Sequence, residues 1–292
     1  MAAGIWGNFL RIVVSALYRA LKWLIPKNRF GDWLLGYLLF VHSHKRLPSR
    51  QMLFNDVFFK IKTSAELLDP LRVFVTDKEY LKLYVKAVVG AQYNVPTIAV
   101  IRDKVAVKHY PFPPDCVIKP TNLSGAIIIR KNNAPVDVDK IASWFDTNYY
   151  EITREINYKF LRPKVIIEPL IFGDDNVDLY SFFCLKGVPK LIQLSVNCLT
   201  ARKNTFFDMA WHKLDFTMLA PIIMDPINKP DNHLEMLMIA NKLSAGFSFV
   251  RIDMYSDGKS CLIGEITHCD GSANATFNPK SGENVASRII FD

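Results

Sequence analysis

The chain has 292 residues, of which 50% are hydrophobic and 22% are charged, and its formal net charge is +8. This length can bury one large core or two smaller ones, and the apolar fraction excludes an intrinsically disordered protein. The basic surplus indicates acidic partners, such as phosphates, anionic lipids or acidic sugars, and carries no information about the fold.

Residues 5–25 predict an amphipathic helix with one polar stripe. Its polar residues, three or four positions apart, are Asn8, Arg11, Ser15, Arg19 and Lys22. Their charges argue against a membrane-spanning helix, and their placement inside the apolar segment argues against a signal peptide. The pattern favours a helix lying on an anionic membrane surface over one that packs on the protein's own core. A second apolar stretch, 33–41, is too short to cross a bilayer.

The next region, 64–90, is predicted to be helical. Thr76 or Asp77 can cap a helix over 78–89. The apolar face expected for that helix consists of Tyr80, Leu83, Tyr84, Ala87 and Val88.

The middle of the chain predicts a hairpin followed by a helix and a strand. Short apolar strands at 116–119 and 126–129 flank a loop of small residues at 121–125. A helix at 137–148 and a strand at 164–170 follow.

The last third predicts strands at 180–184 and 190–196, a helix at 232–243, and a hairpin of strands at 247–255 and 260–267. The core-facing residues expected on the helix are Leu234, Leu237, Met238 and Leu243. Strands and helices mix without strict alternation, which predicts an α+β fold with largely antiparallel sheets.

The five cysteines are odd in number and irregularly spaced, with no pair of the CxxC type. Cysteines at zinc-finger spacing are also absent from the sequence. We therefore expect reduced thiols in a cytosolic protein.

Lys119 ends an apolar strand and precedes the loop Thr121–Gly125. Small residues let backbone N–H groups approach an anion, and the lysine adds a point charge for phosphate oxygens. The alternative is an ordinary hairpin turn with a lysine whose charged end reaches the solvent.

The C-terminal hairpin can gather four polar side chains. Arg251 and Asp253 share one strand face, as do Glu265 and Thr267 on the return strand. Two carboxylates and a hydroxyl are oxygen ligands suited to Mg²⁺, and an arginine beside them suits a phosphoryl group. The alternative is a cross-strand ion pair between Arg251 and Glu265.

Glu168 ends the apolar strand predicted at 164–170 and precedes a proline. A strand end is a suitable place for hydrogen bonds to an adenine or a ribose, and a glutamate facing water is the alternative.

These residues together resemble the ATP-grasp superfamily, and within it the TupA-like family named for teichuronopeptide biosynthesis. The matching segments run in order from about residue 76 to residue 279. They include Thr76-Asp-Lys78, Val117-Ile-Lys-Pro-Thr121 with Ser124-Gly125, Asn148-Tyr-Tyr150, Arg154-Glu155, Ile166-Ile-Glu-Pro-Leu170, Phe207-Asp208, Gly246 to Tyr255, and Gly264-Glu-Ile-Thr267.

The resemblance implies two α+β lobes that grip ATP, preceded by an apolar N-terminal helical segment. We divide the chain accordingly. The expected parts are a possible membrane-surface anchor at 1–63, an N-terminal α/β subdomain at 64–110, a small lobe with the phosphate lid at 111–170, and a C-terminal lobe with the Mg²⁺-binding hairpin at 171–292.

The resemblance also implies roles for single residues, with ATP and Mg²⁺ as cofactors. Lys119 and Arg251 are the implied catalytic residues. The implied nucleotide-binding residues are Lys78, Lys82, Lys119, Asn122, Ser124, Gly125, Glu168 and Lys190. The implied metal ligands are Asp253, Glu265 and Thr267.

Three positions depart from the family pattern. Thr267 stands where the superfamily usually has asparagine, and the phosphate lid has only one glycine, Gly125. The family often has a lysine near Ser181, and its absence either weakens the case for full activity or shifts that role to Lys190.

The resemblance implies a carboxylate–amine ligase that works through an acyl phosphate. With the membrane-surface helix, it predicts attachment of an amino acid to a uronic-acid carboxylate in capsule, O-antigen or teichuronic-type polysaccharide synthesis. The alternatives are a kinase or phosphotransferase acting on a glycan, and a non-catalytic ATP-grasp-like partner in a membrane glycan complex.

The expected partners are ATP, an acidic glycan, an amino acid or amine, and an anionic membrane. The expected location is the cytoplasm, peripheral to the inner face of the membrane. Nucleic acid is not expected, because the chain has no basic tract after residue 50 and no RNP or KH motif.

Overall fold

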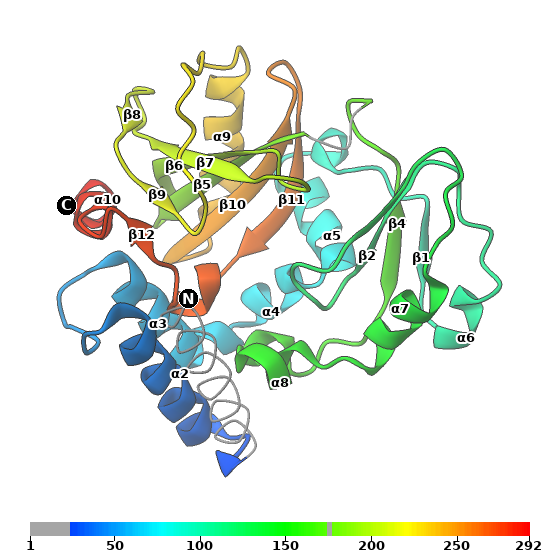
Figure 1. Ribbon diagram of the computed structural model, residues 1–292, viewed down its shortest axis with the longest axis horizontal. Coiled ribbons are helices and arrows are strands. Elements are labelled where there is room, and N and C mark those ends of the chain that lie inside the picture. Colours follow the sequence, from blue (N-terminus) through cyan, green and yellow to red (C-terminus); the bar gives the residue numbers. More distant parts are fainter. Residues whose placement is uncertain (1–23, 174–176) are drawn as a thin grey trace, which may run out of the picture.

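The structure, a computed structural model, describes residues 24–173 and 177–292 (Figure 1). Nearly all of the helix predicted over residues 5–25 lies outside these ranges. Within them, no helix is both long and apolar enough to span a bilayer. The chain forms two lobes, each built on one sheet, and neighbouring strands within each sheet run antiparallel. The predicted α+β class is therefore confirmed.

The small lobe contains a four-stranded sheet. In spatial order its strands are β1 (Ala99–Ile101), β4 (Val165–Glu168), β2 (Cys116–Pro120) and β3 (Ile128–Arg130). Its helices are α6 (Lys104–Val107), α7 (Val138–Ser143) and α8 (Tyr149–Thr153). Ile118 and Ile167 of the sheet are buried in one cluster with Ile141 of α7. The predicted hairpin of β2 and β3 is confirmed, with Cys116 opposite Arg130.

The large lobe contains a six-stranded sheet. In spatial order its strands are β11 (Cys261–Thr267), β10 (Phe249–Ser256), β5 (Asp178–Leu185), β6 (Val188–Val196), β7 (Lys203–Phe207) and β8 (Lys213–Leu214). A separate two-stranded ladder joins β9 (Thr217–Met218) to β12 (Phe277–Asn278). Short 3₁₀ turns lie at 65–68, 91–93, 144–146, 156–158 and 270–273.

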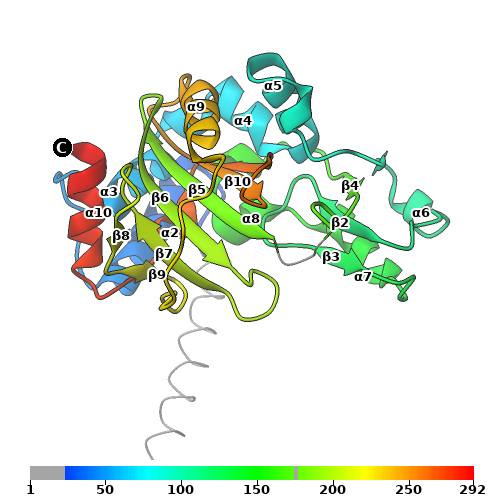
Figure 2. The same ribbon diagram turned by 90° about the horizontal axis from the view of Figure 1, so that it is seen from above.

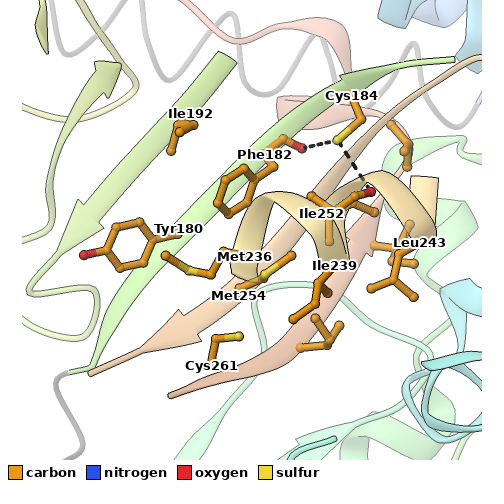
Figure 3. Packing of buried hydrophobic residues seen from close by; sticks show 14 of the residues in the cluster. Tyr180, Phe182, Cys184, Ile192, Met236, Ile239, Leu243, Ile252, Met254 and Cys261 are labelled. Carbon is orange, nitrogen blue, oxygen red and sulfur yellow. Dashed lines mark hydrogen bonds between the residues drawn. The ribbon is translucent and has the colours of Figure 1, made fainter. Parts of the chain in front are cut away.

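Three helices cover one face of the large sheet, as Figure 2 shows. They are α4 (Pro70–Thr76), α5 (Lys78–Val88) and α9 (His233–Ser244). Figure 3 shows Met236 and Ile239 of α9 packed toward Phe182, Ile252 and Met254 of the strands. Burying each such side chain contributes about 1.5–3 kcal/mol to the free energy of unfolding.

The opposite face of the same sheet packs against the N- and C-terminal helices. These are α2 (Arg29–His44), α3 (Phe54–Thr63) and α10 (Gly282–Phe291). Aromatic rings dominate this interface: Phe54 of α3 lies 5.2 Å from Phe183, and Phe58 lies 4.9 Å from Phe249, between ring centroids. Because α3 fills the core here, residues 54–63 are an integral part of the large lobe.

Residues 64–110, predicted as one subdomain, contribute to both lobes. Val75, Leu81 and Val85 of α4 and α5 are buried against the large sheet. Strand β1 instead pairs with β4 of the small lobe. The helices of this segment bury their apolar faces against the large sheet, whereas its strand adds to the edge of the small sheet. The segment is therefore shared between the two lobes.

The predicted faces of two helices are right only in part, since Tyr84, Val88 and Leu237 pack against the core as predicted but other predicted residues do not. In α5 the structure buries Leu81 and Val85, and leaves Tyr80 and Leu83 exposed. In α9 the predicted residues Leu234 and Met238 are exposed, whereas Leu243 is buried as predicted. The residues that α9 buries are His233, Met236, Ile239, Ala240, Leu243 and Ser244. Apolar residues surround both helices, so periodicity does not select the face that meets the sheet.

All five cysteines are free thiols, as expected for a reduced protein. Cys184 donates weak hydrogen bonds to the carbonyls of Phe182 and Ala240, at 3.5 and 4.0 Å (Figure 3). Burial raises the pKa of this thiol to about 12, which makes it a structural rather than a reactive cysteine.

Candidate functional site

An apolar pocket lies between the two lobes. Val117 and Ile129 line it from the small lobe, and Leu179 and Leu199 line it from the large lobe. The polar side chains at its edge are Lys119, Glu168 and Tyr255. A pocket with apolar walls and few polar groups suits a flat heterocyclic ligand.

Glu168 is an acceptor for two lysines. Its carboxylate lies 2.9 Å from Lys119 Nζ and 2.5 Å from Lys82 Nζ, and its side chain is buried. Lys119 comes from β2, which pairs with the strand of Glu168, whereas Lys82 projects from α5. The structure thus brings together three residues predicted for nucleotide binding.

The lysine pair controls the charge of this cluster. Burial by itself raises the pKa of Glu168, but the charges of Lys119 and Lys82 lower it further than burial raises it, so the pKa falls below its usual range. Burial lowers the pKa of Lys82 despite its ion pair. Burial also acts to lower the pKa of Lys119, but interactions with Tyr255 and Glu168 raise it overall. Two ammonium groups around one carboxylate leave net positive charge at the pocket edge, which suits phosphate oxygens.

Lys78 contacts the predicted phosphate lid. Its ammonium donates to the carbonyl of Leu123 at 2.6 Å, and its backbone N–H donates to the carbonyl of Thr121 at 3.2 Å. Asp77 caps α5, as one of the two predicted caps, by accepting from the N–H of Glu79. The start of α5 is therefore joined to the loop between β2 and β3.

The lid residues lie in that same loop. Asn122 is buried and donates to the carbonyl of Thr147 at 3.4 Å. Its Oδ1 is buried and accepts no hydrogen bond from the described residues. Gly125 is exposed with a φ of +75°, a backbone conformation that favours glycine. Ser124 between them is half-buried.

The predicted hairpin of β10 and β11 gathers Arg251, Asp253 and Thr267. Arg251 lies opposite Thr267 in the register, and Asp253 lies opposite Glu265. The guanidinium of Arg251 donates two hydrogen bonds to Asp253, at 2.8 and 2.6 Å, and one to Thr267 at 3.2 Å. Burial acts to lower the pKa of Arg251, but the nearby carboxylates raise it overall.

The second carboxylate bound to Arg251 belongs to Asp270, which forms an ion pair with Nη1. Sequence reasoning missed this residue and expected Glu265 as the alternative partner. Asp270 lies in the 3₁₀ turn after β11, where hairpin periodicity no longer predicts the direction of a side chain. Glu265 is half-buried opposite Asp253.

A row of polar residues crosses the large sheet at the level of Asp253. The register aligns Glu265 with Asp253, Asp253 with Ser181, and Ser181 with Gln193. Ser181 Oγ and Gln193 Oε1 are buried and have no hydrogen-bond partner among the described residues. Sequence reasoning treated Ser181 only as a missing lysine and overlooked Gln193. The sequence signal that could have identified both residues is a single polar residue inside an otherwise apolar strand.

The donor set of this row fits Mg²⁺. Two carboxylates, a hydroxyl at Thr267 and the unpartnered oxygens of Ser181 and Gln193 are all hard oxygen donors. In residues 24–173 and 177–292, no three His, Cys, Asp or Glu side chains form a complete metal cluster. Mg²⁺ usually takes one or two carboxylates and completes its shell with water and phosphate oxygens, so this arrangement suits it.

Lys190 lies apart from these clusters. It is half-buried on β6, beside the turn that joins β5 to β6. Its neighbour Leu191 pairs with Phe183, which pairs in turn with Arg251, so two strand spacings separate Lys190 from the strand of Arg251.

A second polar cluster that the sequence did not predict supports the turn of Asp270. Lys62 of α3 donates to Ser272 Oγ at 2.6 Å, and Ser272 Oγ donates to Glu155 at 2.7 Å. Ser272 has a φ of +58°, which is strained for a residue with a side chain. The cluster joins α3, the segment after α8 and the turn that carries Asp270.

The two lobes and the paired charge clusters define a protein of the ATP-grasp class, whose members use ATP with Mg²⁺. The family model described as TupA-like ATPgrasp matches residues 62–288, and this chain belongs to that family. The resemblance found in the sequence is therefore confirmed.

Several solved structures are similar to this chain. The D-alanine–D-alanine ligase from Helicobacter pylori is 16% identical, with a TM-score of 0.39, over 75% of this chain and 60% of that chain. The ATP complex of the Bacillus anthracis D-alanine–D-alanine ligase is 14% identical, with a TM-score of 0.35, over 67% and 54%. D-cycloserine synthetase DcsG is 16% identical, with a TM-score of 0.37, over 75% and 72%. Among curated proteins, none matches.

Proposed function

We propose that this protein is an ATP-dependent carboxylate–amine ligase. The observation that carries the proposal is the contact of Lys119 with Tyr255, whose ring centroid lies 5.5 Å from the ammonium. Tyr255 and Asp253 share one face of β10, two residues or about 7 Å apart. The nucleotide pocket and the hairpin cluster therefore lie within the reach of one triphosphate.

In this proposal the adenine occupies the apolar pocket between the lobe at 111–170 and the lobe at 171–292. Glu168 contacts the nucleoside, Lys119 and Lys82 hold phosphate oxygens, and the lid residues Asn122, Ser124 and Gly125 cover them. Lys78 positions the lid through its contact with Leu123. Lys190 lies near the start of β6, outside the lining of this pocket, and is given no contact with ATP in this proposal.

The chemistry has two steps. An oxygen of the acceptor carboxylate attacks the γ-phosphorus of ATP, and ADP leaves, giving an acyl phosphate. The amine nitrogen then attacks the acyl carbon, phosphate leaves, and the nitrogen loses a proton. Asp253, Glu265 and Thr267 would hold Mg²⁺, which supplies charge neutralisation for the phosphate oxygens, and Arg251 would orient the transferring phosphoryl group.

The proposed acceptor is the carboxylate of a uronic acid in a surface polysaccharide precursor, and the proposed donor is an amino acid. The family match and the positive charge around Lys119 support an acidic acceptor. The basic, apolar N-terminal segment supports a peripheral position on the inner face of the cytoplasmic membrane, where lipid-linked precursors are found.

Nucleotide binding is tested by thermal shift with Mg²⁺-ATP and by ADP release with a uronate glycan and amino acids. We expect a shift in the wild type that is lost in Lys82→Met and Asp253→Asn. Lys86→Met, on the exposed side of the same helix as Lys82, is the matched control and should behave as the wild type. A shift that survives in both site variants contradicts the assigned pocket.

Product mass separates the ligase from its alternatives. Amide formation gives the summed mass of acceptor and amine less one water, whereas a kinase adds a phosphoryl group to the acceptor. A nucleotide-induced shift without ADP release under any acceptor favours a non-catalytic ATP-grasp-like partner.

A further inference from the structure

Helix α2 presents an apolar face to solvent. Phe30, Leu34, Tyr37 and Val41 follow each other at three- or four-residue spacing, so they share one side of the helix. Phe30 is exposed, whereas the other three are half-buried, and Tyr37 also packs against the apolar cluster of the large lobe. Trp33 flanks this side and stacks on Tyr37 with ring centroids 5.4 Å apart. Phe30 is 64% exposed, and Trp33 is 40% exposed.

The opposite side of α2 fixes its orientation. Asp32 is buried there and accepts a hydrogen bond from Arg154 at 2.9 Å and one from the hydroxyl of Tyr150 at 2.8 Å. Leu35 and Phe40 are buried on the same side. Turning the apolar face inward would expose these residues and break a buried ion pair, so its exposure is a stable feature.

The charge of the whole chain is concentrated in this region. Residues 1–62 contain ten Lys and Arg residues against two Asp residues, which is +8, and residues 63–292 contain 26 of each sign. Both aspartates are buried in ion pairs, Asp32 with Arg154 and Asp56 with Arg46. Among residues 24–62, the exposed charged side chains are therefore all positive: Lys27, Arg29, Lys45, Arg50 and Lys60.

The loop after α2 repeats the same chemistry. Lys45 and Arg50 are exposed, and so are Leu47 and Met52 between and beside them. Exposed apolar side chains interspersed with cations are typical of surfaces that insert into the headgroup region of an anionic bilayer. Aromatic side chains such as Trp33 and Tyr37 are the ones preferred at that depth.

We propose that the outward face of α2, together with the loop at 45–52, is a surface that binds anionic membranes. The inference rests on the proposed membrane association and names the surface responsible for it. Residues 1–23 are the rival occupant of the apolar face, since only residues 24–28 separate them from α2. Packing of that segment would account for the apolar side chains but not for the accumulation of positive charge, to which its own Arg11, Arg19 and Lys22 add.

The test is flotation of the full chain with vesicles of phosphatidylcholine containing about one-third phosphatidylglycerol. The variant Phe30→Ser with Trp33→Ser removes the aromatic face. Its matched control is Leu234→Ser with Met238→Ser on α9, where both side chains are also exposed, at 69% and 60%. We expect the aromatic variant to bind at least tenfold less than the wild type, and the control to bind equally.

A wild type that floats while the aromatic variant floats equally well overturns the α2 surface and leaves membrane association standing. A wild type that stays in solution overturns both. An aromatic variant that unfolds at a markedly lower temperature without losing vesicle binding assigns the face to residues 1–23 instead. The Mg²⁺-ATP thermal shift of the same samples reports separately on the proposed ligase site, which these substitutions do not touch.

Discussion

Arg251 donates two parallel hydrogen bonds to the carboxylate of Asp253, Nε to Oδ1 at 2.8 Å and Nη2 to Oδ2 at 2.6 Å. Both oxygens of the proposed metal ligand are thus engaged by the residue proposed to orient phosphate. A cation at Asp253 would therefore share these oxygens with Arg251, and the buried Asp270 binds the same guanidinium.

This geometry predicts unequal effects of two substitutions at Arg251. Arg251→Ala leaves Asp253 and Asp270 as buried carboxylates without their counter-ion and should lower the free energy of unfolding by about 3–5 kcal/mol. Arg251→Lys keeps the charge but loses the fork, so we expect a smaller loss of about 1–2 kcal/mol. Urea denaturation measures both. Equal losses of unfolding free energy in the two variants would show that the two parallel hydrogen bonds to Asp253 do not contribute to stability.

Arg102→Ala is the control for that experiment. Arg102 is exposed and pairs with Glu79 at the surface. Because exposed ion pairs contribute little, its effect should stay below about 1 kcal/mol.

The cluster around Glu168 predicts an order of stability among three variants. Glu168→Gln leaves Lys82 and Lys119 facing each other without a carboxylate, and we expect a loss of about 2–4 kcal/mol. Lys82→Met leaves one lysine paired with one carboxylate and should cost less. The double variant should cost less than the sum of the two, since it removes the repulsion between the lysines. If the losses of unfolding free energy in the two single variants simply add in the double variant, Lys82 and Lys119 do not share the carboxylate of Glu168.

His268 predicts a pH dependence of stability. Its Nδ1 accepts from Arg72 Nη1 and its Nε2 donates to the carbonyl of Arg72, both at 3.1 Å, because a guanidinium can only donate. Burial, together with the charge of Arg72, lowers the pKa of His268 to about 3. Between that value and its ordinary pKa near 6.5, the unfolded chain binds a proton that the folded chain does not. The contribution of His268 to the free energy of unfolding is therefore fully present above about pH 6.5 and decreases as the pH falls below that value.

The expected loss from His268 is about 3 kcal/mol between pH 7 and pH 4, measured by urea denaturation across that range. His268→Gln should flatten the pH dependence. His42→Gln, at an exposed position of α2, should leave it unchanged. A wild-type and a His268→Gln profile with the same slope would falsify the neutral, buried histidine.

Two substitutions at Ser272 separate the contribution of its hydroxyl to stability from the cost of its backbone conformation. Ser272→Ala removes the hydroxyl that bonds to Lys62 and Glu155, and we expect a loss of about 1–3 kcal/mol. Ser272→Gly removes the same hydroxyl but relieves the positive φ, and should be more stable than the alanine variant by about 1 kcal/mol. Thermal denaturation ranks the two variants, and an alanine variant as stable as the glycine variant argues against backbone strain here.

The sequence by itself determined the two hairpins that carry the site. Alternation along β10 and β11 put Arg251 and Asp253 on one strand face and Glu265 and Thr267 on another, and the small-residue loop after Lys119 marked the turn into β3. It also narrowed the cap of α5 to Thr76 or Asp77, and the cap is Asp77. These features depend on hydrogen bonds and side-chain periods within a few neighbouring residues, which a single sequence displays directly.

Only the tertiary structure decided which charges meet and which helix faces are buried. Lys82 could serve any nearby anion, and the packing of α5 directs it to Glu168. The turn after β11 directs Asp270, rather than Glu265, to Arg251. The face of α9 that meets the sheet was decided in the same way. Such choices depend on contacts between distant parts of the chain, where several apolar faces and several counter-ions are chemically equivalent until packing leaves room for only one.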